Sequence, residues 1–141
     1  MMEFAVRYAE TDQMGVANHA RYLDWFSEGR VAWLKDLGES YALWEEQGKA
    51  LPVIGLGVKY RTSARFMQKL SLSTALLKCD RRTLAFGYRL HCQNTLLAEA
   101  VTRHCLLQGG RAVRIAAEFV DRFQHHLQPD FVHPDSSWWG L

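Results

Sequence analysis

The sequence predicts an α+β protein in which one long helix lies across a face of an antiparallel sheet of five or six strands. Two patterns support this fold class. Apolar residues recur every three or four positions between Tyr22 and Leu37, as in a helix with one buried face. From Gly48 almost to the end of the chain, apolar stretches of strand length are separated by turn residues, as in strands joined by hairpins.

Length and composition are those of a globular domain. The chain has 141 residues, of which 48% are hydrophobic and 23% charged, so we expect a buried core and no extensive disorder. A single domain is expected over residues 1–141, with its core at about residues 3–123 and an irregular tail at 124–141. The net charge of +2 is too small to favour a nucleic-acid surface.

Two features favour the cytoplasm. Stretches without an acidic or basic residue are nine residues long at most, whereas a membrane-spanning helix needs about 20 apolar residues. The first ten residues contain Glu3, Arg7 and Glu10 where an export signal needs its apolar stretch. We therefore expect neither a membrane span nor a secretory signal.

The first expected elements are a strand and a loop. Phe4, Val6 and Tyr8 alternate with Ala5, Arg7 and Ala9, which predicts a strand with Tyr8 on its core side. Residues 10–18 show neither period and therefore predict a loop.

The long helix follows this loop. It is expected to end at Gly38, since glycine is common just after a helix. Gly29 within it costs about 1 kcal/mol relative to alanine, which is tolerable where a sheet or partner backbone approaches closely. Residues 39–47 predict a second, short helix.

Strands dominate the remainder. Gly55 and Gly57 suggest a bulge or a close backbone approach, and Gly109-Gly110 predicts a tight hairpin turn. Residues 116–123 predict a terminal helical turn, and the tail with Trp138-Trp139 is expected to be mobile or packed on a neighbour. The expected strands are residues 51–60, 69–80, 84–92, 96–108 and 111–115.

The loop before the long helix offers the best candidate chemistry. A helix N-terminus presents unpaired N–H groups and a positive dipole end, which suit an anion or a developing oxyanion. Asp12, seven residues before His19, could attack a carbonyl carbon or activate a water molecule. The alternative is structural, with Asp12 and Asn18 bonding turn amides and capping the helix.

Three motifs in this sequence resemble a known family. The first is Tyr-x-x-Thr-Asp-x-x-Gly-Val-x-x-His-x-x-Tyr, residues 8–22. The others are Tyr-Arg-Thr-Ser-Ala-Arg-Phe at 60–66 and Gly-Arg-Ala-Val-Arg-Ile at 110–115. Together they resemble the hotdog-fold acyl-CoA thioesterases of the 4-hydroxybenzoyl-CoA thioesterase family, YbgC-like branch, over about residues 3–120. The resemblance implies a hotdog fold, in which the sheet wraps around the long helix.

The resemblance also implies an activity and a set of site residues. The activity is hydrolysis of an acyl-CoA to the free acid and coenzyme A, without a metal or other cofactor. Asp12 matches the catalytic aspartate, a nucleophile or general base, and the backbone N–H at His19 matches the group that polarises the thioester carbonyl. Tyr8 matches a tyrosine that helps shape this site. Gly15, Asn18 and Arg65 are expected to bind the substrate.

The family resemblance further implies a homodimer or a dimer of dimers, with each active site at the subunit boundary. Two departures from the family pattern are visible. Ala17-Asn18 replace a more frequent Val-Tyr pair, which puts the choice of acyl group in doubt, and Ser63 stands where proline is common.

Other candidate sites have a simpler explanation. His125-His126 with His133 match no zinc spacing and are expected to be surface histidines. Glu28 on the long helix is expected to be solvated. Positive charge for the coenzyme A phosphates is available from Arg61, Arg65, Arg81, Arg82, Arg111 and Arg114.

The cysteines are expected to be inert. Their number is odd, and they form no CxxC pair. His91 and His104 each precede a cysteine, but adjacent strand residues point to opposite faces, which disfavours a thiol nucleophile. The three cysteines are Cys79, Cys92 and Cys105.

Two other functions stay open at this stage. One is a hotdog acyl-CoA hydratase or dehydratase, which product analysis on an enoyl-CoA would separate from a thioesterase. The other is a non-catalytic acyl-CoA-binding sensor, for which an added output module would be expected.

Overall fold

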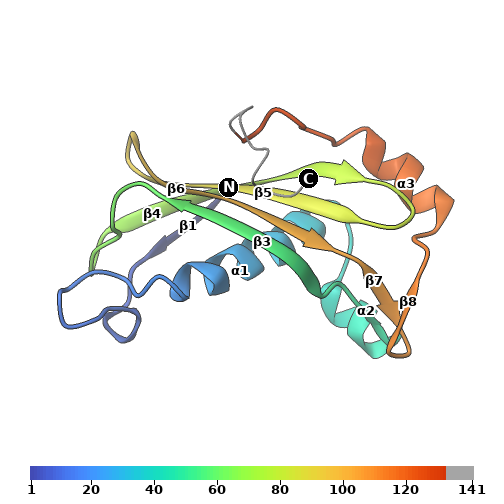
Figure 1. Ribbon diagram of the computed structural model, residues 1–141, viewed down its shortest axis with the longest axis horizontal. Coiled ribbons are helices and arrows are strands. Elements are labelled where there is room, and N and C mark those ends of the chain that lie inside the picture. Colours follow the sequence, from blue (N-terminus) through green and yellow to red (C-terminus); the bar gives the residue numbers. More distant parts are fainter. Residues whose placement is uncertain (133–141) are drawn as a thin grey trace.

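A computed structural model describes residues 1–132, and Figure 1 shows its sheet curving over the long helix. The main sheet of this described part has five antiparallel strands in the order β1-β4-β5-β6-β3. Their bounds are Met2–Ala5 (β1), Val53–Tyr60 (β3), Lys69–Cys79 (β4), Leu84–Cys92 (β5) and Thr95–His104 (β6). The expected α+β class with a hotdog arrangement of sheet and helix is confirmed.

A second, small sheet and two shorter helices lie beyond the far end of the long helix (Figure 1). The small sheet has the order β2-β7-β8, and the expected tight turn at Gly109-Gly110 joins its last two strands, with both glycines at positive φ. Its strands are Lys49–Ala50 (β2), Leu106–Gln108 (β7) and Arg111–Val113 (β8). The helices are Tyr41–Glu46 (α2) and Ala117–Gln124 (α3), close to the expected ranges.

The long helix α1 spans Arg21–Asp36 and is 16 residues long. Gly38 follows its C-terminus as expected, and the positive φ of +83° lets the Glu39 N–H donate back to the Leu34 carbonyl oxygen at 2.9 Å. The close approach expected at Gly29 is also confirmed. A Cβ atom there would lie 2.6 Å from Oγ1 of Thr74 on β4, so glycine is needed at this position for α1 to pack this closely against the sheet.

The core lies between α1 and the concave face of the sheet. Alternate residues of β5 point toward α1, as the period-two pattern predicts. The ring of Tyr88 stacks on Phe26 with 4.8 Å between centroids, and Phe86 meets Trp33 edge-on at 5.4 Å. Such aromatic pairs contribute about 1 kcal/mol beyond the area that they bury.

The prediction of Tyr8 on the buried face of a strand is wrong. Strand β1 ends at Ala5, and Tyr8 begins a 3-10 turn, Tyr8–Glu10, with 77% of its surface exposed. The cause is the Glu10 carboxylate, whose Oε1 accepts the Arg7 N–H at 2.9 Å and turns the chain away from the sheet. The period-two pattern therefore stops at Val6, which is buried.

The single strand expected at residues 96–108 is also wrong, because the chain divides it between the two sheets. β6 ends at His104 and pairs with β3, whereas β7 begins at Leu106 and pairs with β2. Pro52 lies opposite this break and has no N–H with which to continue the ladder. The irregularity expected near Gly55 is present as a register shift between Val53 and Gly55.

The convex face of the sheet is partly covered by the chain's own C-terminal segment. After α3 the Gln128 N–H donates to the Leu76 carbonyl oxygen at 2.8 Å, and Val132, 3% exposed, packs against Leu77, Ala85 and Val101. The expectations about His133 and Trp138-Trp139 lie outside the described residues. Among residues 1–132, no helix is long and apolar enough to cross a membrane.

Candidate functional site

The loop between the 3-10 turn and α1 is a compact, hydrogen-bonded platform. Thr11 and Ala17 form an antiparallel bridge, and the Asp12 N–H donates to the Val16 carbonyl oxygen at 2.9 Å. The Asn18 N–H closes the base of the loop by donating to the Glu10 carbonyl oxygen at 2.8 Å. These bonds fix the backbone of a segment that carries most of the predicted site residues.

Asp12 is exposed at the tip of this loop. Its Oδ1 accepts the Met14 N–H at 2.8 Å, and the Gly15 N–H donates back to the Asp12 carbonyl oxygen at 3.1 Å. The turn needs Gly15, whose φ is +77°. The structural role considered for Asp12 is therefore real, and it holds the carboxylate in one orientation at the surface.

The segment that leads into α1 presents a free backbone donor on the same loop as Asp12. Asn18 bonds a turn amide as expected, since its Oδ1 accepts the Ala20 N–H at 2.9 Å. It does not cap α1, because the capping residue is Ala20 and no side chain caps the helix. His19 is exposed, and its carbonyl oxygen accepts the Tyr60 hydroxyl at 2.9 Å. Within residues 1–132 no acceptor binds the His19 N–H. An exposed N–H at a helix start is suited to a developing oxyanion.

Glu10, which the sequence did not indicate as a site residue, is a buried carboxylate that ties the platform to α1 by hydrogen bonds. Glu10 is 4% exposed, and its Oε2 accepts the Trp25 indole N–H at 2.7 Å. Burial raises the pKa of Glu10, but the hydrogen bonds from the Arg7 N–H, the Trp25 indole and the Arg7 guanidinium outweigh it and lower the pKa below its ordinary value. The ionised group thus links the loop to α1. Glutamate in a loop gives no sequence signal for such burial.

A pair of tyrosines positions the helix start against the sheet. Tyr22 is 2% exposed, and its hydroxyl accepts the Ala64 N–H at 3.0 Å. Its ring meets Tyr60 edge-on with 4.9 Å between centroids. Burial raises the pKa of both tyrosines, so both hydroxyls are neutral and can act as donor or acceptor. The Ala17 N–H also joins the loop to this segment by donating to the Ala64 carbonyl oxygen at 2.7 Å.

Tyr8 and Arg65 border the platform on its outer side. The backbone of Arg65 forms an isolated antiparallel β-bridge with Val16. The ring of Tyr8 lies edge-on to Phe66 with 5.7 Å between centroids. Both Tyr8 and Arg65 are exposed. The fold therefore gathers all six predicted site residues around one loop, although no hydrogen bond within the described residues joins Asp12 to His19.

Other sequence candidates are placed away from this platform. Glu28 is exposed on α1, as expected, and His125 and His126 are exposed after α3. Within residues 1–132 no three potential metal ligands gather. Cys79 is buried, and burial together with the neighbouring Asp80 raises the pKa of its thiol to about 11, which agrees with an inert core residue.

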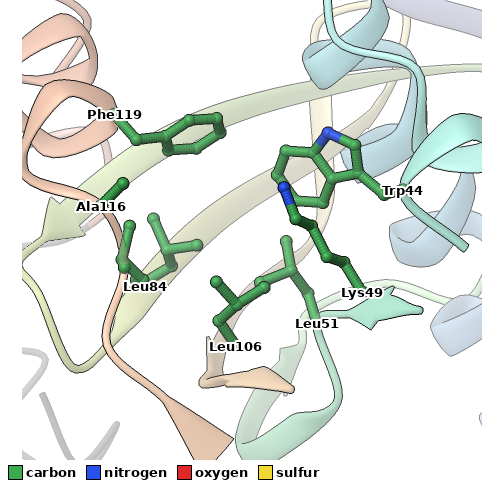
Figure 2. A pocket seen from close by; sticks show the side chains of 8 residues that line it. Trp44, Lys49, Leu51, Leu84, Leu106, Ala116 and Phe119 are labelled. Atoms are coloured by element: carbon green, nitrogen blue, oxygen red, sulfur yellow. The ribbon is translucent and has the colours of Figure 1, made fainter. Parts of the chain in front are cut away.

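Two apolar hollows differ in their relation to the platform. A groove of about 240 Å³ runs from Leu23, in the first turn of α1, between that helix and β3, and it is also lined by Phe26, Val53 and Leu56. Figure 2 shows a smaller cavity of about 60 Å³ between Trp44, Leu84 and Phe119. Leu84 pairs with His104, whereas Tyr60 pairs with Ala98. Six residues of β6 are about 20 Å long, so the cavity at Leu84 lies far from the platform, whereas the groove extends to Leu23 in the first turn of α1.

Comparison with known proteins gives a consistent assignment. The family model of the thioesterase-like superfamily matches residues 6–127. YneP of Bacillus subtilis is 36% identical over 89 residues, which cover 63% of this chain and 64% of YneP. The acyl-CoA thioesterase YbgC of Haemophilus influenzae is 30% identical over 125 residues, covering 87% of this chain and 92% of YbgC.

A solved structure shows the same fold. The crystal structure of the hypothetical protein TT1821 from Thermus thermophilus matches with a TM-score of 0.84 and 38% identity, over 89% of this chain and 97% of that one. The family and the enzyme class indicated by the sequence motifs, thioester hydrolases, are confirmed. The chain belongs to the thioesterase-like superfamily.

Proposed function

We propose that this protein hydrolyses the thioester of an acyl-CoA at the loop that joins Asp12 to the start of α1. The observation that supports it most is the exposed carboxylate of Asp12 on the same braced loop as the free N–H of His19. The relative named YbgC is an acyl-CoA thioesterase, which favours coenzyme A as the thiol part of the substrate.

The chemistry assigns one role to each group. The Asp12 carboxylate attacks the thioester carbon directly or takes a proton from the attacking water. The His19 N–H and the positive end of the α1 dipole stabilise the oxyanion of the tetrahedral intermediate. When water attacks, the carbon–sulfur bond breaks, the proton held by Asp12 passes to the sulfur, and the free acid and the thiol of coenzyme A leave. When Asp12 itself attacks, breaking the carbon–sulfur bond leaves a mixed anhydride on Asp12, which water hydrolyses to the free acid and the carboxylate, while coenzyme A takes a proton from water and leaves as the thiol. This scheme uses no metal or cofactor.

We further propose that the working unit is a homodimer or a dimer of dimers. β3 is an edge strand of the sheet, and its apolar side chains are about half exposed, at 46% for Val53, 52% for Ile54 and 45% for Leu56. A second copy over this edge would bury these side chains and shield the nearby groove from water. The change Leu56→Lys should therefore yield monomers by light scattering and lower the turnover.

The test of catalysis is Asp12→Asn. Asparagine keeps an oxygen that can accept the Met14 N–H, so the loop is retained while the carboxylate is lost. We expect turnover of acyl-CoA substrates to fall about 10²- to 10⁴-fold, measured by release of the coenzyme A thiol. Asp121→Asn, at an exposed position of α3, is the matched control and should retain wild-type activity. Near-normal turnover of several acyl-CoAs by the Asp12 variant would rule out the proposed role.

A further inference from the structure

Arg30 stands out in the apolar groove between α1 and β3. It is half-buried, and its guanidinium donates to the Tyr88 hydroxyl and to Oγ of Ser27, each at 3.1 Å. Both partners are neutral hydroxyls. Within the described residues no carboxylate forms an ion pair with Arg30.

The groups beneath Arg30 do not offset its charge. The Tyr88 hydroxyl is 2.7 Å from Oγ1 of Thr102, which is 2.8 Å from Nε2 of His104. Nδ1 of His104 lies 3.0 Å from the Leu51 carbonyl oxygen. Burial and the charge of Arg30 lower the pKa of His104 to about 4, and burial raises the pKa of Tyr88 to about 12. This buried chain of polar groups is therefore neutral at neutral pH.

Arg30 and Ser27 both line two neighbouring hollows along α1. One is the groove of about 240 Å³ that begins at Leu23, and the other, of about 220 Å³, continues along α1 toward Val31 and Leu34. The two hydrogen bonds use two of the five N–H groups of an arginine. A cation among apolar side chains is costly to desolvate unless an anion or a strong acceptor meets it.

The position of Arg30 along the helix defines what it can contact. Because the guanidinium bonds Ser27, it lies about one turn before its own Cα. Ser27 is six residues after Arg21, which corresponds to about 9 Å along the helix axis. An acyl group whose carbonyl lies at the start of α1, and whose tail follows the groove, would thus bring its far end to the guanidinium.

We propose that Arg30 is a specificity-determining residue that binds the far end of the acyl group. It favours medium-length acyl groups that end in a carboxylate over plain alkyl chains of equal length, since arginine binds carboxylates through paired hydrogen bonds. This inference rests on the proposed thioesterase function. The buried hydroxyls of Tyr88 and Thr102 hold the guanidinium from below and leave its remaining donors to the substrate.

The experiment compares a matched pair of substrates, octanoyl-CoA and the coenzyme A monothioester of octanedioic acid. They share chain length and differ at the far end. We expect wild type to have a higher kcat/KM for the octanedioic thioester, and Arg30→Met to lower the ratio of the two kcat/KM values about ten- to a hundredfold. Arg30→Lys should keep part of the preference, because lysine retains the charge without the planar fork.

Controls separate a specific role from a general one. Lys35→Met removes a positive charge from an exposed position of the same helix and should keep the wild-type ratio. If Arg30→Met does not fold, as judged by circular dichroism, Ser27→Ala, which frees the guanidinium from one support, should lower the ratio by a smaller factor. Equal losses for both substrates, or a wild-type preference for octanoyl-CoA, would overturn the role of Arg30.

The inference can fail separately from the proposed function. Turnover of octanoyl-CoA by wild type reports on the thioesterase activity alone. Binding of the monoamide of octanedioic acid and of octanamide, which differ only in the far carboxylate, is measured by isothermal titration calorimetry and reports on Arg30 without any turnover. Tighter binding of the monoamide that is lost in Arg30→Met supports the inference even if both thioesters remain intact, and equal binding of the two amides refutes it.

Discussion

The buried imidazole of His104 should make the protein less stable in mild acid. It is 0% exposed, and burial followed by the charge of Arg30 lowers its pKa from 6.5 to about 4. The unfolded chain therefore binds a proton near pH 6.5, whereas the folded chain does not until the pH approaches 4. Stability is fully present above pH 6.5 and is lost progressively as the pH falls toward 4.

The size of this effect follows from the two pKa values. Over the whole shift of about 2.5 pH units, His104 accounts for about 3 kcal/mol, at about 1.4 kcal/mol per unit. Between about pH 7.5 and about pH 5.5 the expected loss is about 1 kcal/mol, because at the lower pH the unfolded imidazole is mostly protonated and the folded one is not.

Urea denaturation at these two pH values measures the loss, with wild type compared with His104→Gln. Glutamine does not titrate and can still hydrogen-bond Thr102 and the Leu51 carbonyl oxygen. The variant should lose about 1 kcal/mol less than wild type between the two pH values. Protein concentration is held constant, since any dimer couples stability to association.

An exposed histidine provides the control for the pH dependence. His125→Gln, just after α3, should show the same difference between the two pH values as wild type. Other titrating groups, including the carboxylates, are common to all three proteins and cancel in the comparison. An identical loss in wild type and His104→Gln would show that the buried imidazole is not a source of acid sensitivity.

Three further predictions concern the helix contact, the buried carboxylate and the buried thiol. Gly29→Ala should destabilise the protein by about 1–2 kcal/mol in urea denaturation, because the clash with Thr74 exceeds the helix-propensity gain of about 1 kcal/mol; a rise in stability would contradict the close packing. Glu10→Gln should cost about 1–3 kcal/mol and reduce turnover, since it removes a charge-assisted bond to Trp25; unchanged stability and activity would exclude the bracing role. Cys79 in the folded protein should react with iodoacetamide about a hundredfold more slowly than an ordinary thiol, as its pKa is raised to about 11, and peptide mapping by mass spectrometry would reveal any faster labelling.

Much of the fold follows from local patterns in the sequence. The long helix, its end at Gly38, the strand at 84–92 and the glycine turn at 109–110 each have a signal contained within a few residues. The two errors arose where a distant contact overrides the local pattern. Pro52 cannot continue the strand pairing with the segment about fifty residues later in the chain, so that segment is divided between the two sheets as β6 and β7. Glu10 turns the chain away from the sheet, although the apolar alternation in the sequence continues to Tyr8.

The site was predictable in part for the same reason. A motif with fixed spacing identified the loop that carries Asp12, Asn18 and His19. The expected bond of Asn18 to a turn amide is confirmed, whereas the expected helix cap by Asn18 is wrong. The roles of Asp12, His19 and Tyr8 in catalysis stay predictions, as does the cytoplasmic location. Arg30 and Glu10 could not be found by sequence, because their importance comes from burial beside groups 15 to 58 positions away.

The two edges of the main sheet are unequal. β3 offers eight residues at one edge, and β1 offers four at the other. In the dimer that we propose, a twofold axis would join the two β3 edges, so each copy would use the long edge of its main sheet in the first pairing. We expect the remaining short β1 edges to be poor templates for further strands, so that growth would stop at this pairing.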